Sequence, residues 1–213
     1  MTQSLLDPET VKRRRPGRLA PRGYDEACWS QVTKAVDTIL VDAFKARRYP
    51  LYIHGPTGTG KTCVAALLFR SCSKPPLWAR ADDLLLSLSC GRTSDQRISI
   101  ELSEDSTEDG MRRTRRGLTF GSVMQKISDT HCLFLDDIAV RKPTESMRQI
   151  FFDLLEIRKG RPFVITSNHS PEELCELYED DRILSRLLRG TVLHLSGGDR
   201  REGLGKRFLS EVG

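Results

Sequence analysis

The sequence GPTGTGKT at residues 55–62 constrains the fold of this chain more than any other stretch. It follows an apolar run, LYIH at 51–54, and precedes a helix-like run, CVAALLFR at 63–70. A loop of this pattern binds phosphate when it joins a strand to a helix, because its glycines let the backbone curl and turn successive N–H groups toward phosphate oxygens. The helix adds the positive end of its dipole. The stretch therefore predicts a nucleoside triphosphate site.

All eight residues of this loop are predicted to contact the nucleotide. We expect Lys61 to reach the β- and γ-phosphates and the Thr62 hydroxyl to bind Mg²⁺. The predicted nucleotide ligands are Gly55, Pro56, Thr57, Gly58, Thr59, Gly60, Lys61 and Thr62.

A pair of carboxylates follows the apolar run CLFL at 132–135. That run predicts a central strand, and ligands bind at the carboxyl ends of strands in sheets of this kind. We expect Asp136 to hold Mg²⁺ together with Thr62, and Asp137 to orient or deprotonate the attacking water. The pair narrows the prediction from phosphate binding to triphosphate hydrolysis.

Asn168 ends the next predicted strand, which contains VITS at 164–167. Its amide is placed to bond the attacking water or the γ-phosphate, although an asparagine there is also a common turn residue. A GTPase would carry an Asn-Lys-x-Asp guanine reader, and NHSP at 168–171 does not match it. The sequence therefore predicts a triphosphate site with Mg²⁺ and without a guanine reader of this kind.

Predicted strands alternate with predicted helices along most of the chain, which favours an α/β fold with a mainly parallel, five-stranded sheet flanked by helices. An amphipathic helix is predicted at 25–48. The predicted strands are 49–54, 77–80, 131–138, 161–167 and 191–195, and the helices between them are 60–73, 81–90, 119–128, 143–159, one beginning at Ser170-Pro171, and 181–189.

The excess of basic over acidic residues is concentrated near the beginning of the chain. Residues 1–22 hold six basic and two acidic residues, whereas the rest of the chain holds 28 basic and 27 acidic ones. We expect 1–24 to form a basic tail with little stable structure, which either contacts nucleic-acid phosphates or is simply solvated. Residues 25–200 are predicted to form the core, and 201–213 a C-terminal tail.

The stretch 91–116 breaks the alternation of strands and helices. It holds six acidic and six basic residues, with an acidic block at 101–109 and a basic block at 112–116. Such a segment buries too little apolar surface to fold alone, so we expect a surface insertion or extended loop. A solvated loop is the simpler reading, and a DNA-facing loop is the alternative.

No apolar run approaches the ~20 residues that a membrane span needs. The six cysteines include no CxxC pair. These features predict reduced thiols in a cytoplasmic protein without a membrane partner.

Four motifs in this order resemble those of the AAA+ ATPases, and among them the DnaC/IstB-like group of helicase loaders and transposition helpers. GPTGTGKT resembles Walker A, LFLDD Walker B, ITSN sensor 1, and DRILSRL at 181–187 box VII, over roughly residues 25–200. The resemblance implies that Arg186 is an arginine finger offered to the ATP of a neighbouring subunit. Arg182, paired with a nearby aspartate, is a structural alternative. Arg158 stands where the group often has arginine, or is a helix-end charge.

The resemblance also implies a function. It implies an ATPase that forms homo-oligomers with ATP and loads a replicative helicase onto single-stranded DNA. The alternatives are a transposase helper, a P-loop kinase of small molecules and a nucleotide-dependent adaptor. Two features depart from AAA+ enzymes at large. Asp137 replaces a glutamate, which favours slow hydrolysis, and 196–213 is too short for a helical lid, which agrees with the DnaC/IstB-like group. A third feature departs from that group itself, because 1–24 gives no folded partner-binding domain.

Overall fold

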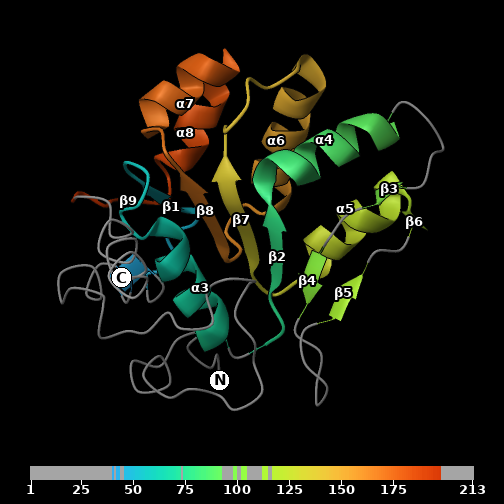
Figure 1. Cartoon of the computed structure of the whole chain (residues 1–213), viewed down its shortest axis with the longest axis horizontal. Coiled ribbons are helices and arrows are strands. Elements are labelled where there is room, and N and C mark those ends of the chain that lie inside the picture. The colour runs from blue at the N-terminus through green and yellow to red at the C-terminus, as the bar shows by residue number, and fades with distance from the viewer. Residues whose placement is uncertain are drawn as a thin grey trace, which may run out of the picture.

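The computed structural model describes residues 40, 42–43, 46–72, 74–92, 98–99, 102–104, 112–114 and 117–197. Within 98–117 it describes the backbone alone. The predictions for the basic tail, for most of the helix at 25–48 and for the missing lid therefore lie outside the described residues. Elements carry the labels of Figure 1.

Five parallel strands form the centre of the sheet, as predicted (Figure 1). All five carboxyl ends lie at one edge, because neighbouring strands run in the same direction. In spatial order the strands are β2 (Leu77–Arg80), β7 (Leu133–Ile138), β8 (Phe163–Ser167), β1 (Leu51–His54) and β9 (Thr191–His194).

Helices cover both faces of the sheet because alternate strand residues point to opposite faces and both sets are apolar. In β7, Phe134 joins a core with α3, while Leu133 and Leu135 join a second core with the other five helices. The helices confirm the predicted ones to within a few residues: α3 (Lys61–Ser71), α4 (Ala81–Arg92), α5 (Phe120–Asp129), α6 (Glu145–Ile157), α7 (Pro171–Tyr178) and α8 (Asp181–Leu187).

Side-chain caps fix where the later helices begin. Ser170 forms a capping box with Glu173, directly before Pro171 at the first position of α7. Thr144 accepts the Met147 N–H at the start of α6. These caps explain why the beginnings of these helices could be predicted from sequence. None of the helices in the described ranges has the length and apolar character needed to cross a bilayer.

The charged stretch 91–116 contributes strands, which the sequence analysis did not predict. β4 (Leu102–Glu104) pairs antiparallel with β2, and β5 (Arg112–Thr114) pairs with β4, so the sheet has seven strands. β3 (Ile98–Ser99) and β6 (Gly117–Leu118) form a separate small ladder. The β4–β5 register sets the acidic block against the basic block, with Glu104 opposite Arg112. The segment has little apolar surface to bury, and backbone hydrogen bonds to the edge of β2 hold it in place instead.

Candidate active site

The loop 55–62 joins β1 to α3 and curls as its glycines predict. Gly55, Gly58 and Gly60 have φ values of 145°, 84° and 96°, a region that favours glycine. A Cβ built on Gly55 would lie 2.1 Å from the Leu195 carbonyl oxygen, so no larger residue fits beside the end of β9. The loop geometry therefore agrees with the motif.

Lys61 lies inside the curl of this loop and is only 5% exposed. Its ammonium donates hydrogen bonds of 2.8 Å to the carbonyl oxygens of Gly55 and Pro56. The Thr59 hydroxyl donates to the Pro56 carbonyl at 2.9 Å, which fixes the same turn. A positive charge is thus held at the mouth of the loop, where phosphate oxygens would lie.

Asp136 meets the loop at the carboxyl end of β7. Its carboxylate accepts a 2.6 Å hydrogen bond from the Thr166 hydroxyl. Burial raises the pKa of Asp136 to about 6, the hydroxyls of Thr166 and Thr62 oppose that rise, and the charge of Asp137 adds to it. The two predicted Mg²⁺ ligands are therefore neighbours, and their oxygens are of the kind that Mg²⁺ prefers.

Asp137 follows directly and adopts a left-handed backbone conformation, with φ of 56°. Its N–H donates a 2.9 Å hydrogen bond to the Thr166 hydroxyl. The ladder between β7 and β8 is irregular between Leu135 and Ile138, and a bulge of this kind re-aims side chains next to a site. Two successive carboxylates thus differ: that of Asp136 is buried, and that of Asp137 is half-buried.

Asn168 is exposed and follows β8 directly, while its neighbours are held firmly. The Ser167 hydroxyl donates to the Ile138 carbonyl at 3.1 Å and accepts the His169 N–H at 3.1 Å. The Tyr52 hydroxyl donates to the His169 carbonyl at 2.8 Å. The structure therefore brings Asn168 to the same edge of the sheet as the phosphate loop and the aspartate pair.

Two residues of this region were missed by the sequence analysis, Thr166 and Asp82. Thr166 is 1% exposed and bonds both members of the aspartate pair. Asp82, in the first turn of α4, accepts the N–H groups of Ala139, at 3.0 Å, and Arg141, at 2.8 Å. It thereby fixes the loop that follows β7. Thr166 lies inside ITSN, but Asp82 has no sequence signal beyond an acidic helix start.

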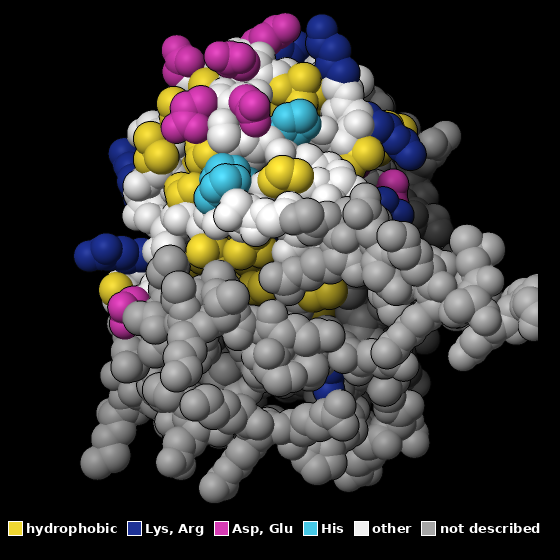
Figure 2. All heavy atoms as spheres, turned by 60° about the vertical axis from the view of Figure 1, so that its left-hand side comes forward, with side chains coloured by type: hydrophobic (Ala, Val, Ile, Leu, Met, Phe, Trp, Pro, Cys, Tyr) yellow, Lys and Arg dark blue, Asp and Glu magenta, His cyan; other side chains and the backbone are white. Residues whose placement is uncertain are grey.

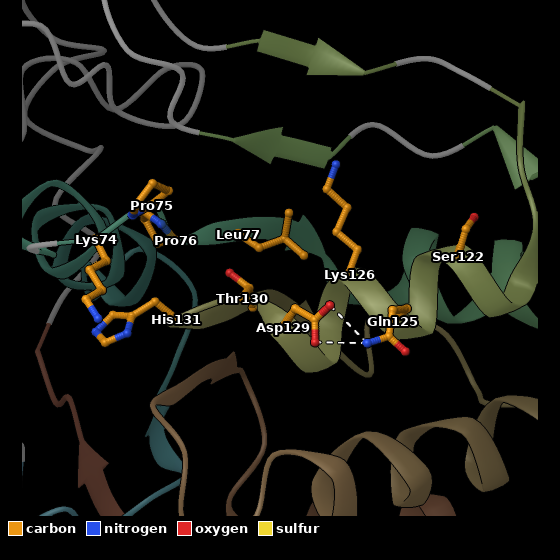
Figure 3. A pocket seen from close by; sticks show the side chains of 10 residues that line it. All are labelled: Lys74, Pro75, Pro76, Leu77, Ser122, Gln125, Lys126, Asp129, Thr130 and His131. Atoms are coloured by element: carbon orange, nitrogen blue, oxygen red, sulfur yellow. Dashed lines mark hydrogen bonds between the residues drawn. The ribbon is translucent and has the colours of Figure 1, made fainter.

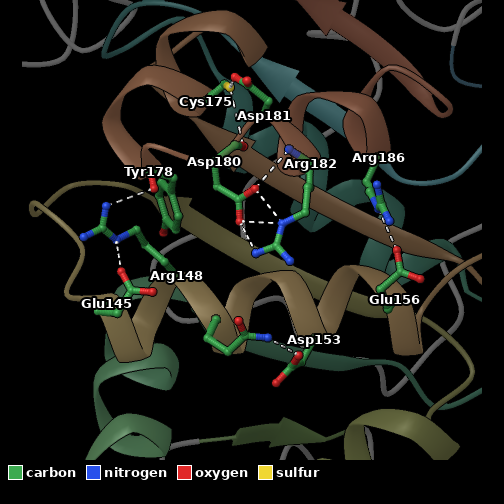
Figure 4. Close-up of polar contacts among 11 residues, drawn as sticks. Glu145, Arg148, Asp153, Glu156, Cys175, Tyr178, Asp180, Asp181, Arg182 and Arg186 are labelled. Atoms are coloured by element: carbon green, nitrogen blue, oxygen red, sulfur yellow. Dashed lines mark hydrogen bonds and ion pairs between the residues drawn. The ribbon is translucent and has the colours of Figure 1, made fainter.

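Arg186 lies elsewhere, on α8, and points toward α6 (Figure 4). Its Nε donates a 2.6 Å hydrogen bond to Glu156 Oε1, and its guanidinium lies 4.9 Å from the centre of the Phe152 ring. Within the described residues, Arg186 makes no hydrogen bond to the phosphate loop of its own chain. Arg182 lies over the same ring at 4.2 Å and is held by Asp180 through three side-chain hydrogen bonds.

Arg158 is a structural residue and is only 1% exposed. Its guanidinium donates to five main-chain carbonyl oxygens at 2.6–3.4 Å, three of them at the C-terminal end of α5, and burial lowers its pKa to about 10. The cation therefore caps α5 rather than its own helix. The five carbonyls belong to Ile127, Ser128, Thr130, His131 and Pro162.

A separate groove of about 630 Å³ lies between α5 and residues 74–77 (Figure 3). Lys74, Lys126 and His131 are among its lining residues. It borders Leu77, the first residue of β2, whereas the phosphate loop lies at the carboxyl ends of the strands. This groove is therefore distinct from the candidate active site.

Comparison with known proteins identifies the fold. No protein-family model matches the sequence, and no curated protein matches it. Among solved structures, DnaI is 20% identical with a TM-score of 0.56, over 86% of this chain and 100% of that chain. The DnaC helicase loader is 15% identical with a TM-score of 0.57, over 83% of this chain and 100% of that chain. The chain has the AAA+ fold.

AMPPCP-bound DnaA from Aquifex aeolicus also shares this AAA+ fold. It is 17% identical with a TM-score of 0.57, over 83% of this chain. The chain spans about half of the DnaA chain that it matches, 50%. At such low identity these likenesses establish the fold, and activity has to be argued from the site.

Proposed function

We propose that this protein binds and hydrolyses ATP. The observation that carries the proposal is the shared position of the curled phosphate loop and the aspartate pair at the carboxyl ends of the parallel strands β1 and β7, where Thr62 lies near Asp136. Lys61 is held in the same loop and would exchange its carbonyl partners for phosphate oxygens. The AMPPCP-bound DnaA structure, which has the same fold, supports nucleotide binding.

The residues present fit a magnesium ion. Thr62 and Asp136 would hold it, and when bound it would neutralise charge on the phosphates. Asp137, half-buried beside Asp136, is placed to orient or deprotonate water. Asn168 would hydrogen-bond the same water or the γ-phosphate. The short side chain of Asp137 favours slow turnover, which suits a switch better than a motor.

We infer that Arg186 completes the site of a neighbouring copy in an ATP-bound homo-oligomer. Arg186 has one carboxylate partner 30 residues away, whereas Arg182 is bound by the adjacent Asp180, whose carboxylate also caps α8. Arg186 therefore has one partly exposed ion pair to exchange, whereas Arg182 would have to leave the carboxylate that caps its own helix, so Arg186 is the easier arginine to offer to a partner. Fingers of this kind accelerate hydrolysis by roughly 10³–10⁵-fold.

Two observations suggest which macromolecules the protein acts on: its fold, and the exposed surface beside the candidate active site. The solved structures with this fold include the DnaC helicase loader and a DnaA bound to single-stranded DNA. Val140, Arg141 and Lys142 are exposed in the loop that Asp82 fixes next to the aspartate pair. Cations held beside a nucleotide site suit phosphate contacts. We propose a cytoplasmic loader of a replicative helicase onto single-stranded DNA, with a transposase as the alternative partner.

The test is steady-state ATPase activity with and without single-stranded DNA and the replicative helicase of the same host. We expect slow basal hydrolysis that both additions together stimulate, and loss of hydrolysis in Lys61→Ala. Indifference to DNA and helicase would exclude the loader and favour the transposase helper. Phosphate transfer to a small molecule instead of water would indicate the kinase, and binding without turnover would indicate the adaptor.

A further inference from the structure

Helix α8 presents a stripe of arginines. Arg182 and Arg186 are four residues apart and project from one face of the helix, and Arg189 lies in the turn that follows Leu187, the last residue of α8. The first two lie over the Phe152 ring of α6. Leu188, at the end of the helix, is 54% exposed and is one of three large apolar side chains that are exposed in the described ranges. We call this surface the arginine stripe.

Helix α7 presents the opposite charge. Glu172, Glu173 and Glu176 are exposed in its first two turns. Figure 2 shows acidic side chains gathered at the top of the molecule, where α7 lies, close to histidine side chains. Burial lowers the pKa of His54, and the charges of Glu172 and Glu173 oppose that fall. We call these three residues the glutamate stripe. The Tyr52 hydroxyl of β1 bonds the His169 carbonyl just before α7, so the stripe begins near the strand that leads into the phosphate loop.

Among the described residues, Arg182 and Arg186 form no ion pairs with the glutamate stripe of their own chain. Arg182 and Arg186 pair with Asp180 and Glu156, and no ion pair among the described residues joins either to the glutamate stripe. Two complementary surfaces at different places on one molecule produce a head-to-tail contact when two copies meet. The charge pattern therefore fits a second copy of this chain.

We propose that the arginine stripe of one copy docks on the glutamate stripe of the next. Because the glutamate stripe begins near the strand that leads into the phosphate loop, this contact would bring Arg186 toward the nucleotide of the neighbour. Leu188 would be the apolar anchor of the contact. The inference rests on the proposed function in one respect, the ATP-dependent assembly with Arg186 in trans, and adds the surfaces that make it.

The carboxylates that already pair with these arginines disfavour nucleic acid as the partner of the arginine stripe. Asp180 and Glu156 offset two of the three arginine charges, and the side chains of Arg186 and Glu156 are 25% and 38% exposed. One net positive charge is little for a nucleic-acid backbone, whose binding depends on several phosphate contacts. Partly exposed pairs of this kind can exchange for the carboxylates of another protein. A second copy is therefore favoured over DNA at this surface.

A charge-swap experiment tests the contact. Assembly of the full chain with ATP and Mg²⁺ is followed by sedimentation velocity against protein concentration. We expect Arg189→Glu alone, and Glu172→Lys with Glu176→Lys, each to raise the concentration for half-maximal assembly about tenfold. A chain carrying all three changes should return to within about threefold of the wild type. Lys74→Glu, an equal charge change outside both stripes and at the edge of the sheet opposite the phosphate loop, is the control.

The outcomes separate the docking surfaces from the proposed function. If the wild type assembles with ATP but the combined variant is no better than the single ones, the docking surfaces are wrong and the ATPase proposal stands. Singly changed chains that assemble like the wild type overturn the docking too. A wild type that never assembles refutes the oligomeric site itself. Loss of single-stranded DNA binding in Arg189→Glu, with unchanged assembly, would replace the second copy by nucleic acid.

Discussion

The Thr166 hydroxyl donates a 2.6 Å hydrogen bond to Asp136 Oδ1 and accepts one of 2.9 Å from the Asp137 N–H. One buried side chain on β8 therefore holds both successive carboxylates at the end of β7. It orients the carboxylate of Asp136 and stabilises the left-handed backbone of Asp137, whose φ is 56°. Positions held in such conformations cluster at functional sites.

Thr166→Val should weaken this junction. Valine keeps the shape but leaves the Asp137 N–H without its acceptor and Asp136 with one donor fewer, so we expect a loss of about 1–3 kcal/mol in the free energy of unfolding. Urea denaturation measures it, and ATPase activity should fall in parallel. Thr166→Ser keeps the hydroxyl and is the control. Equal stability and activity of the valine and serine variants would contradict the role of the hydroxyl.

The contrast between Lys61 and Thr166 shows what could be predicted from this sequence. Lys61 belongs to a contiguous loop whose function is encoded in its spacing, and the five parallel strands follow from apolar runs that alternate with helices. Thr166 and Asp82 act on residues about 30 and 57 positions away, so no local pattern marks them. β4 and β5 depend on pairing with the edge of β2, which a search for apolar runs does not detect.

The raised pKa of Asp136 predicts that the difference in free energy of unfolding between the wild type and Asp136→Asn depends on pH. Both proteins are measured in EDTA to exclude metal. A rise from 3.8 to about 6 corresponds to about 3 kcal/mol. The stabilising effect of protonation is fully present below about pH 4 and is lost as the pH rises through 6. The asparagine variant should therefore gain up to about 3 kcal/mol relative to the wild type between pH 4 and pH 8. A difference that is constant with pH would contradict it.

Asp82→Ala should destabilise the loop after β7. Asp82 is 7% exposed, and its loss leaves the N–H groups of Ala139 and Arg141 without their acceptor. We expect a loss of about 2 kcal/mol in the free energy of unfolding, because buried unpaired donors are costly. ATPase activity should fall as well. Asp83→Ala is the control, because Asp83 is 60% exposed and pairs only weakly with Arg80. Equal effects of the two substitutions would refute the role of Asp82.

Arg158→Met should lower stability without lowering nucleotide affinity. Five carbonyl oxygens lose their donor, so we expect a loss of at least about 3 kcal/mol by urea denaturation. Arg158→Lys should recover part of it, since an ammonium cannot reproduce the planar fork. ATP binding, measured by calorimetry below the unfolding range, should be unchanged because Arg158 lies at the edge of the sheet opposite the phosphate loop. Lost ATP affinity at wild-type stability would give Arg158 a functional role instead.

The hydrogen bond from Arg186 to Glu156 predicts the concentration dependence of ATP hydrolysis. If Arg186 must leave Glu156 to reach a neighbour, then Glu156→Gln removes a competing charge. The protein concentration for half-maximal ATPase activity should fall by about two- to fivefold, the range that an exposed ion pair supports. Glu145→Gln, which removes the exposed pair with Arg148, is the matched control and should leave that concentration unchanged. Arg186→Ala should abolish the concentration dependence in either background. A higher half-maximal concentration in Glu156→Gln would mean that Glu156 orients Arg186 for the neighbour rather than restraining it.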